Sequence, residues 1–352
     1  MIGRHTVKTF FKSMASAAAL TVGLSASAAV SAETTLIVGT WQPPGNPMNS
    51  VVWPTWAEWV EEATEGRVKV KIEQDVGHPK TYFQLVEDGV INAGWSYHGY
   101  GPGRFKLPVA VELPGLNVSA EAASVALWKT QEKYFAEAGE YEGLTLLATL
   151  THGPGQLHSI EPINDLSDLQ GKKIRIGGGV QTELGERMGI TPVAAPGSKV
   201  YEMMQQGVID GVFMPVTEQK SLRLHEVAPN LTVFPGGMYL GSFSMFIDPY
   251  FMEDLDPKDR EAIMSVSGEK LSALAGRAWD QADVEGLEAA KAAGVTIKEL
   301  GPNDPMTLEF RELIKGMDDA WIESVSDRDV DARAALEELR TIAREYEAQI
   351  QE

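Results

Sequence analysis

The hydrophobic positions along the chain change repeatedly between a two-residue and a helical period. Residues 68–72 alternate between a β-branched residue and lysine, which predicts a strand with one exposed face. Residues 52–63 carry apolar side chains at helical spacing, which predicts a helix. By the same criteria we expect further strands at Leu36–Gly39, Ala93–Tyr97, Leu144–Thr149, Leu231–Val233 and Ser242–Ile247, helices at Tyr82–Asp88 and Ser119–Ala138, and long helical runs from Pro257 onward that include Glu269–Ala290. This alternation predicts an α/β fold.

One arginine lies where the pattern predicts the end of a strand. Within Leu169–Gly211 we expect strand, helix, strand, helix and strand in turn, beginning with a strand at Lys173–Ile176. Gly177–Gly179 end this strand before a helix that starts near Thr182, so Arg175 belongs to its carboxyl end. In open α/β sheets that end faces the ligand crevice, and a guanidinium matches a carboxylate or sulfonate. We therefore expect Arg175 to bind an anion; a surface ion pair is the alternative.

The N-terminus has the pattern of a targeting segment. Three Lys or Arg residues within the first twelve precede a short run of small apolar residues at Ser13–Leu24, and Val30–Ala32 fits the small-residue rule for cleavage. The run is too short to span a bilayer, and no later apolar run is long enough either. We therefore expect residues 1–32 to be a cleaved signal peptide, and the mature protein, from about Glu33, to reach the periplasm without inserting into the membrane.

The chain is strongly acidic, with 50 Asp and Glu against 30 Lys and Arg and a formal net charge of −20. Such a surface argues against nucleic acid or anionic lipid as a partner. It also repels anions at long range, so an anion site must be a local basic point such as Arg175. The chain has no cysteine, which excludes the common thiolate zinc sites.

Motifs for catalysis or metal binding are not found in the sequence. The histidines have no metal-ligand spacing such as HExxH. Residues 94–99 lack the GxSxG spacing of a nucleophile elbow, and no Gly-Lys-Ser/Thr follows Gly177–Gly179, so these glycines are not a P-loop. We therefore expect no enzymatic activity, no metal site and no cofactor.

Three motifs resemble those of the periplasmic solute-binding subunits of TRAP transporters, the tripartite ATP-independent type. They are YGPGRFKLPVAVELP at Tyr100–Pro114, GKKIRI at Gly171–Ile176 and VYEMMQQGVIDG at Val200–Gly211. The order of the expected elements also agrees over nearly the whole mature chain. The resemblance implies a two-lobed periplasmic binding protein fold, in which mixed sheets are flanked by helices and a long helix crosses both lobes at the hinge.

The resemblance also has implications for the lobes, the ligand and the partners. It places lobe I at 33–152 and 241–281, and lobe II at 153–240 and 282–352. An arginine that matches Arg175 is expected to hold one organic acid in the cleft between the lobes. In the family an asparagine just after the DG of the third motif assists this arginine, and Met214 stands at that place here. The implied partners are a small and a large integral membrane subunit, with transport driven by an ion gradient.

Further candidate ligand-binding residues lie at strand ends and in the loops that follow them. Aromatic side chains there would close the cleft over an apolar or cationic ligand body. Gln156 and His158 would face the same way on a strand that enters lobe II, and we expect one of them to replace the missing asparagine as a hydrogen-bond donor. Core packing is the alternative for the apolar residues. Together with Arg175, the candidates are Trp41, Trp95, Tyr97, His98, Gln156, His158, Phe213, Met214, Tyr239 and Phe243.

These observations predict a non-catalytic receptor that binds a small organic anion and delivers it to the membrane subunits of a TRAP transporter. Met214 and the aromatic residues favour an aromatic or branched monocarboxylate, a 2-oxo acid or a zwitterion over a sugar acid. An ABC-type solute-binding protein and an exported α/β enzyme that acts on an organic acid are the alternatives.

Overall fold

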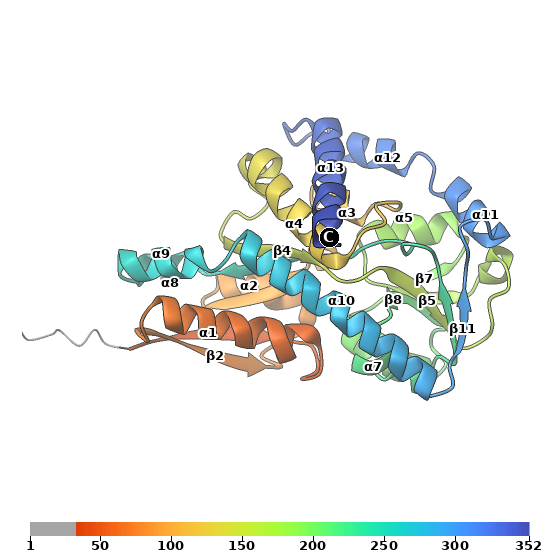
Figure 1. Ribbon diagram of the computed structural model, residues 1–352, viewed down its shortest axis with the longest axis horizontal. Coiled ribbons are helices and arrows are strands. Elements are labelled where there is room, and N and C mark those ends of the chain that lie inside the picture. The colour runs from red at the N-terminus through yellow and green to blue at the C-terminus, as the bar shows by residue number, and fades with distance from the viewer. Residues whose placement is uncertain (1–32, 352) are drawn as a thin grey trace, which may run out of the picture. The chain divides into compact units, whose positions relative to one another are not determined.

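Two mixed β-sheets hold the strands of residues 33–351 (Figure 1). The computed structural model describes residues 33–351, and the signal peptide predicted at 1–32 lies outside them. The first sheet has the strand order β2-β1-β3-β10-β4, in which β10 is antiparallel to both of its neighbours. Its strands are β1 (Thr34–Thr40), β2 (Val68–Gln74), β3 (Ala93–Tyr97), β4 (Thr145–Thr151) and β10 (Ser242–Ile247).

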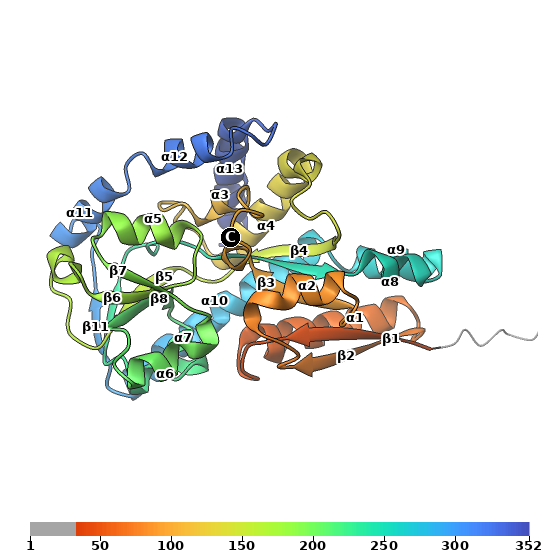
Figure 2. The ribbon, with the colours of Figure 1, turned by 180° about the vertical axis from the view of Figure 1, so that it is seen from behind.

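The second sheet takes most of its strands from the middle of the chain. Its order is β11-β9-β5-β8-β6-β7, with β6 parallel to β7 and β8, and β5 antiparallel to β8 and β9. Its strands are β5 (Gly155–Ser159), β6 (Lys173–Ile176), β7 (Thr191–Ala194), β8 (Gly211–Pro215), β9 (Asn230–Val233) and β11 (Thr296–Glu299). Seen from behind, β6, β7 and β8 lie beside α5 and α6 (Figure 2).

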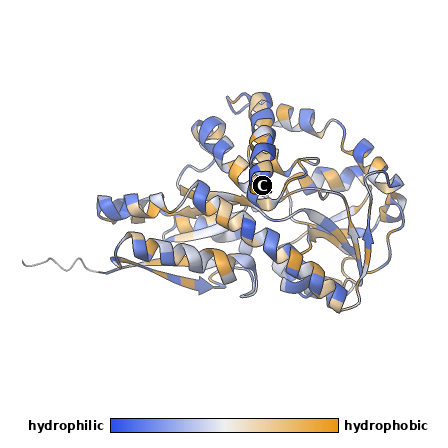
Figure 3. Ribbon diagram, in the orientation of Figure 1, coloured by the Kyte–Doolittle hydropathy of each residue, from blue (hydrophilic) through white to orange (hydrophobic). Residues whose placement is uncertain are grey.

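Helices flank both sheets, and α10 runs across the front of the view from α9 to α7 (Figure 1). Hydrophilic and hydrophobic residues are interspersed along α10 and α13, as expected for helices that pack through one face (Figure 3). The helices are α1 (Trp53–Ala63), α2 (Tyr82–Glu87), α3 (Val109–Glu112), α4 (Ala120–Thr130), α5 (Val180–Arg187), α6 (Val200–Gln205), α7 (Glu218–Ser221), α8 (Pro249–Asp254), α9 (Pro257–Ser265), α10 (Glu269–Ala292), α11 (Pro305–Leu313), α12 (Met317–Ser324) and α13 (Ala332–Ile350).

Each sheet has its own large hydrophobic core. One cluster joins Leu36 and Phe246 of the first sheet with Trp56 of α1, and all three side chains are fully buried. The other joins Ile174 of the second sheet with helical residues that include Leu339 of α13. Burying side chains of this size stabilises the fold by about 1.5–3 kcal/mol each. The two cores agree with the predicted two-lobed α/β fold.

The long helix α10 carries two glycines at close backbone contacts. Each contact lies at the start of another helix, one in each half of the molecule. A Cβ atom on Gly276 would lie 2.6 Å from the carbonyl carbon of Ala120, where α4 begins. A Cβ atom on Gly286 would lie 2.7 Å from the Cα atom of Thr217, just before α7. Real Cβ atoms do not approach backbone so closely, so both contacts require glycine.

Two aspartates of α10 bind the N-termini of the same two helices. Asp280 accepts hydrogen bonds from the N–H groups of Ala120 (2.7 Å) and Glu121 (2.9 Å), and Asp283 accepts one from Thr217 (2.7 Å). The first N–H groups of a helix have no partner within the helix, so each carboxyl group completes one helix start. Within a single turn, α10 thus holds a helix of each half.

Most elements lie where the hydrophobic pattern predicts them. The strands at Ala93–Tyr97, Lys173–Ile176 and Ser242–Ile247 have the predicted bounds. The helix expected at Ser119–Ala138 is interrupted, because α4 ends at Thr130 and a π-helix at Gln131–Phe135 follows. The pattern also misses α8 and β11, which are short and partly exposed and therefore lack a clear period.

The strands of the two sheets come from separate ranges of the chain, and the lobe bounds remain a prediction. All strands of the first sheet lie within 33–152 and 241–281, and those of the second within 153–240 and 282–352. The last helix contacts both halves, because α13 packs along α4, which packs on β4 of the first sheet, and Leu339 of α13 belongs to the core that contains Ile174 of the second sheet. None of the helices within residues 33–351 combines the length and hydrophobicity that a membrane crossing requires.

Candidate functional site

A cavity lies where side chains from the two sheets meet. Aromatic side chains form much of its wall, and its polar groups include one arginine and one glutamate. The first sheet, the loops that follow its strands, and α10 contribute Trp41, Gln42, Tyr97, Tyr100, His152, Phe243 and Trp279. The second sheet and its adjoining segments contribute Arg175, Gly177, Gln181, Gly197, Met214, Pro215, Glu218 and Tyr239.

Arg175 is the one basic side chain of this lining apart from the neutral His152. It lies on β6, paired with Val193 of β7 and Val212 of β8, and only 3% of its surface is exposed. Its Nε donates a hydrogen bond to the carbonyl oxygen of Ala195 at 2.8 Å, which fixes the plane of the guanidinium. Within residues 33–351 no acidic side chain forms an ion pair with it. The terminal nitrogens are therefore available to an anion in the cavity.

Glu218 is the acidic side chain of the cavity. It opens α7, is 1% exposed, and accepts a hydrogen bond from the hydroxyl of Ser221. Burial raises the pKa of Glu218 to about 7, while Ser221 and the positive charge of Arg175 act in the opposite direction. The cavity thus holds one guanidinium and one carboxyl group that do not pair directly.

Two tyrosines of the first lobe reach the second lobe across the cavity. The hydroxyl of Tyr97 donates to the carbonyl oxygen of Gly178 at 3.0 Å, and the hydroxyl of Tyr100 accepts from the N–H of Gly197 at 3.1 Å. A Cβ atom on Gly178 would lie 2.7 Å from the carbonyl oxygen of Gly99, and its φ of 113° also favours glycine. These contacts hold the two lobes together around the cavity.

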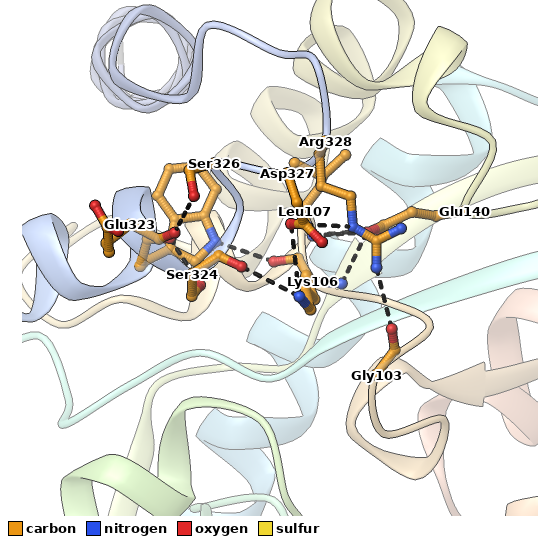
Figure 4. Close-up of polar contacts among 10 residues, drawn as sticks. Gly103, Lys106, Leu107, Glu140, Glu323, Ser324, Ser326, Asp327 and Arg328 are labelled. Atoms are coloured by element: carbon orange, nitrogen blue, oxygen red, sulfur yellow. Dashed lines mark hydrogen bonds and ion pairs between the residues drawn. The ribbon is translucent and has the colours of Figure 1, made fainter.

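The loop that follows Tyr100 is held by hydrogen bonds to the end of α12 and to the segment after it. Figure 4 shows Lys106 donating to the carbonyl oxygen of Ser324 (3.2 Å) and Arg328 donating to that of Gly103 (3.1 Å). The buried Glu140 accepts hydrogen bonds from the N–H groups of Lys106 and Leu107. This network keeps the loop, and with it Tyr100, in place.

A stack of aromatic rings supports one wall of the cavity. Trp41 stacks on Trp95 with ring centroids 4.7 Å apart, and Trp95 contacts Phe243 at 5.4 Å. The indole N–H of Trp41 donates to the carbonyl oxygen of Trp95 at 3.1 Å, and that of Trp95 donates to the Thr40 hydroxyl at 2.9 Å. Both indoles are therefore satisfied within the protein and offer apolar faces.

The structure brings six of the eleven predicted residues to the cavity and leaves five outside its lining. Those that line it are Trp41, Tyr97, Arg175, Met214, Tyr239 and Phe243. Trp95 lies behind Trp41, and Phe213 is fully buried in the core. His98 does not line the cavity, and its ring nitrogens bond the hydroxyls of Ser242 (2.9 Å) and Tyr141 (2.7 Å).

The two residues expected to replace the asparagine form hydrogen bonds with backbone groups instead. The Gln156 amide accepts from the N–H of Phe234 at 2.8 Å and donates to its carbonyl at 3.4 Å. His158 bonds the carbonyl oxygen of Met214 at 3.0 Å and the Gln219 side chain at 2.6 Å. Neither side chain lines the cavity, so the expected replacement by Gln156 or His158 does not fit the structure.

Sequence reasoning missed several residues of the lining, above all Tyr100, His152, Gln181, Glu218 and Trp279. Tyr100 begins one of the recognised motifs, and Glu218 follows Met214 by four positions, so both had a usable signal. Trp279 lies on α10 and reads as an ordinary core residue of a long helix. Within residues 33–351 no cluster of three or more His, Asp or Glu side chains could hold a metal ion.

Comparisons with known proteins agree with this architecture. The family model described as bacterial extracellular solute-binding protein, family 7 (DctP), matches residues 38–321. The protein TsaT of Comamonas testosteroni, which is named an outer membrane transporter protein, is 32% identical over 312 residues, or 88% of this chain and 91% of its own.

Two solved structures are similar over almost their whole length. A TRAP periplasmic solute-binding protein from Bordetella bronchiseptica with bound (R)- and (S)-mandelate has a TM-score of 0.86 and 32% identity, and covers 89% of this chain and 99% of its own. A TRAP solute-binding protein from a marine metagenome, described as specific for aromatic acid ligands and solved with 3-hydroxybenzoate, has a TM-score of 0.83 and 31% identity, and covers 90% and 99%. The resemblance inferred from the three motifs is therefore confirmed: the chain belongs to family 7 of the bacterial extracellular solute-binding proteins, the DctP family of TRAP receptors.

Proposed function

We propose that this receptor binds an aromatic monocarboxylate in the cavity between its lobes and delivers it to the membrane subunits of a TRAP transporter. The observation that carries the proposal is Arg175, a buried guanidinium that lines the cavity without an acidic partner within residues 33–351. The guanidinium forms no direct ion pair within residues 33–351, so a ligand carboxylate is expected to bind its terminal nitrogens.

The walls of the cavity support an aromatic body for this ligand. Trp41, Tyr97, Phe243 and Trp279 offer ring faces or edges, and the thioether of Met214 offers a polarisable apolar surface. Sugar acids need many hydrogen-bond partners, whereas Tyr97, Gln181 and Tyr239 of this lining already bond backbone groups of the protein. The bound mandelate and 3-hydroxybenzoate of the two solved relatives belong to the proposed class.

In this proposal Tyr100 donates the hydrogen bond to the ligand carboxylate that an asparagine is expected to donate in the family. Its hydroxyl accepts from Gly197, so its own proton remains to be donated. Burial raises the pKa of Tyr100, and the charge of Arg175 beside it acts in the opposite direction. The hydroxyl therefore stays protonated at neutral pH and lies close to the guanidinium. We propose that the ligand carboxylate accepts hydrogen bonds from both groups, while Met214 contacts the ring.

The cellular setting follows from the family and the leader. The DctP family is periplasmic, and residues 1–32 have the pattern of a signal peptide. We propose that the leader exports the chain and that a small and a large membrane subunit receive the ligand from it. Its relatives are solute receptors, which supports a non-catalytic function.

Titration calorimetry and thermal unfolding with benzoate, mandelate and 3-hydroxybenzoate test the proposal. Benzamide is the matched control, since it has the same ring and nearly the same shape but no charge. We expect at least one acid to bind and, at 100 times its dissociation constant, to stabilise the protein by about 2.7 kcal/mol. Benzamide should have no such effect. Equal binding of benzamide, or a preference for sugar acids or C4-dicarboxylates, would contradict the proposal.

A further inference from the structure

The cavity contains two ionisable groups of opposite charge that do not form an ion pair with each other. Arg175 and Glu218 both line it, each is at most 3% exposed, and no contact within ion-pair distance joins them. We infer that Glu218 takes up a proton when a carboxylate binds Arg175, and that it thereby restricts the cavity to ligands with a single negative charge. This inference rests on the proposed function and adds a residue that selects the charge of the ligand.

The count of charges in the cavity leads to this inference. Before binding, an ionised Glu218 balances Arg175. A bound monocarboxylate adds a second negative charge to a space with one guanidinium, and an excess charge in a buried site is expensive. Protonation of Glu218 restores neutrality without moving a side chain. A dicarboxylate would leave one negative charge uncompensated even after that protonation, and such ligands should be rejected.

The surroundings of Glu218 make it the group that titrates most easily. Arg175 on β6 favours its ionised form, whereas burial opposes it, and the pKa of Glu218 is about 7 in the free protein. Tyr100 and Tyr239 line the same cavity, and Asp283 of α10 lies outside the lining but near enough to feel the charge of Glu218; the pKa values of all three groups are raised, mainly by burial. A second carboxylate near Arg175 raises the pKa of Glu218 further.

Other buried acids and the cavity histidine are less suited to this role. Asp283 is buried but does not line the cavity, and it accepts a hydrogen bond from Thr217. Glu112 also lies outside the lining and accepts hydrogen bonds from Val180 and Ser242. Burial lowers the pKa of His152 to about 4, so protonation near neutral pH would require a much larger change there.

The sign of the pH dependence follows from linkage. Because the bound state holds the proton more tightly than the free state, affinity is highest below pH 7 and falls as the pH rises above the pKa of free Glu218. For a monocarboxylate, the dissociation constant should increase roughly tenfold between pH 7 and pH 8.5. Proton uptake should be greatest near pH 8, where Glu218 is ionised in the free protein.

Calorimetric titration of the full chain with benzoate at pH 8, in phosphate and in Tris, measures this proton directly. The two buffers have very different ionisation enthalpies, so the difference in observed heat gives the protons taken up. We expect about 0.5–1 proton per bound benzoate for the wild type. Glu218→Gln should take up none and should bind with an affinity that does not change between pH 7 and 8.5. Asp283→Asn is the matched control and should keep the wild-type uptake.

Several results would overturn the inference and leave the proposed function intact. Benzoate binding to the wild type without proton uptake is one, and the unchanged wild-type protein is sufficient to show it. Unaltered uptake in Glu218→Gln, or loss of uptake in Asp283→Asn alone, is another. Binding of zwitterionic phenylalanine in preference to benzoate would show that Glu218 stays ionised and holds an ammonium group. Absence of any binding by aromatic acids would instead remove the proposed function itself.

Discussion

Replacement of Arg175 by methionine tests the proposed site most directly. Methionine has a similar length and no charge, so the side chain can remain in the same space. A ligand carboxylate would lose its charged hydrogen bonds to the guanidinium and become a buried, partly unpaired anion. Loss of one partner of such a pair costs about 2–5 kcal/mol, which corresponds to a dissociation constant roughly 30- to 4000-fold higher. Arg175→Lys should recover only part of this, because a point charge cannot reproduce the fork of the guanidinium.

The free protein should tolerate the change to methionine. Within residues 33–351 no acidic side chain depends on Arg175 for an ion pair. The main loss is the hydrogen bond to the carbonyl oxygen of Ala195, and an unpaired buried acceptor costs about 1–3 kcal/mol. Removal of a buried charge compensates part of that loss. We therefore expect a folded protein whose melting temperature lies within several degrees of the wild type.

Calorimetric titration with the acid that the wild type binds best, together with a melting curve, measures both effects. Benzamide again controls for binding through the ring alone. Wild-type affinity in a folded Arg175→Met protein would refute the assignment of Arg175 as the anion-binding residue. A protein that does not fold would show instead that the guanidinium stabilises the free state, against the reasoning above.

Three further changes test other parts of the structure. Tyr100→Phe removes the hydroxyl that accepts from Gly197 across the cavity, and calorimetry should show affinity for the acid weakened about 5- to 10-fold; an unchanged affinity would argue against Tyr100 as the donor. Burial raises the pKa of the Glu112 carboxyl group from the ordinary value of 4.5 to about 7 in the folded protein. The protonated carboxyl group therefore contributes fully to the stability of the fold below pH 4.5, and this contribution is lost as the pH rises through 7. The melting temperature should therefore fall between pH 5 and 8, and less steeply in Glu112→Gln; identical slopes would contradict this. Gly286→Ala, whose Cβ would lie 2.7 Å from a backbone Cα atom, should lower stability by about 1–3 kcal/mol in a denaturant titration. Gly301→Ala, whose Cβ would have no atom within 4 Å apart from its chain neighbours, should not.

The place of Arg175 beside the cavity could be predicted from the sequence because its environment is local. A short β-branched strand and three glycines mark the carboxyl end of β6, and Arg175 lies on that strand. Most of the cavity wall has no such signal. Tyr100, Glu218 and Trp279 come from distant parts of the chain, and hydrophobic periodicity shows that a residue is buried without showing that it borders a cavity.

Gln156 and His158 show a second limit of sequence reasoning. Polar residues on a buried strand suggest ligand contacts, yet buried backbone groups also need hydrogen-bond partners. Gln156 satisfies both backbone groups of Phe234, where β9 ends, and His158 bonds the carbonyl oxygen of Met214 on β8. Whether a polar side chain on a buried strand contacts the ligand or bonds a backbone group depends on the register of the neighbouring strands. A single sequence does not show that register.

The position of β10 in the first sheet has a consequence for how the protein folds. During synthesis, β10 appears after every strand of the second sheet except β11. In the folded protein it lies between β3 and β4 and pairs with both. Until residues 242–247 arrive, β3 has one unpaired edge and β4 has no partner strand, and open edges promote pairing between chains. Closing the sheet also requires contacts between residues about 90–150 positions apart, which slow folding. The first half of the chain therefore cannot complete its native sheet on its own, and we expect it to be prone to aggregation until residues 242–247 have been made.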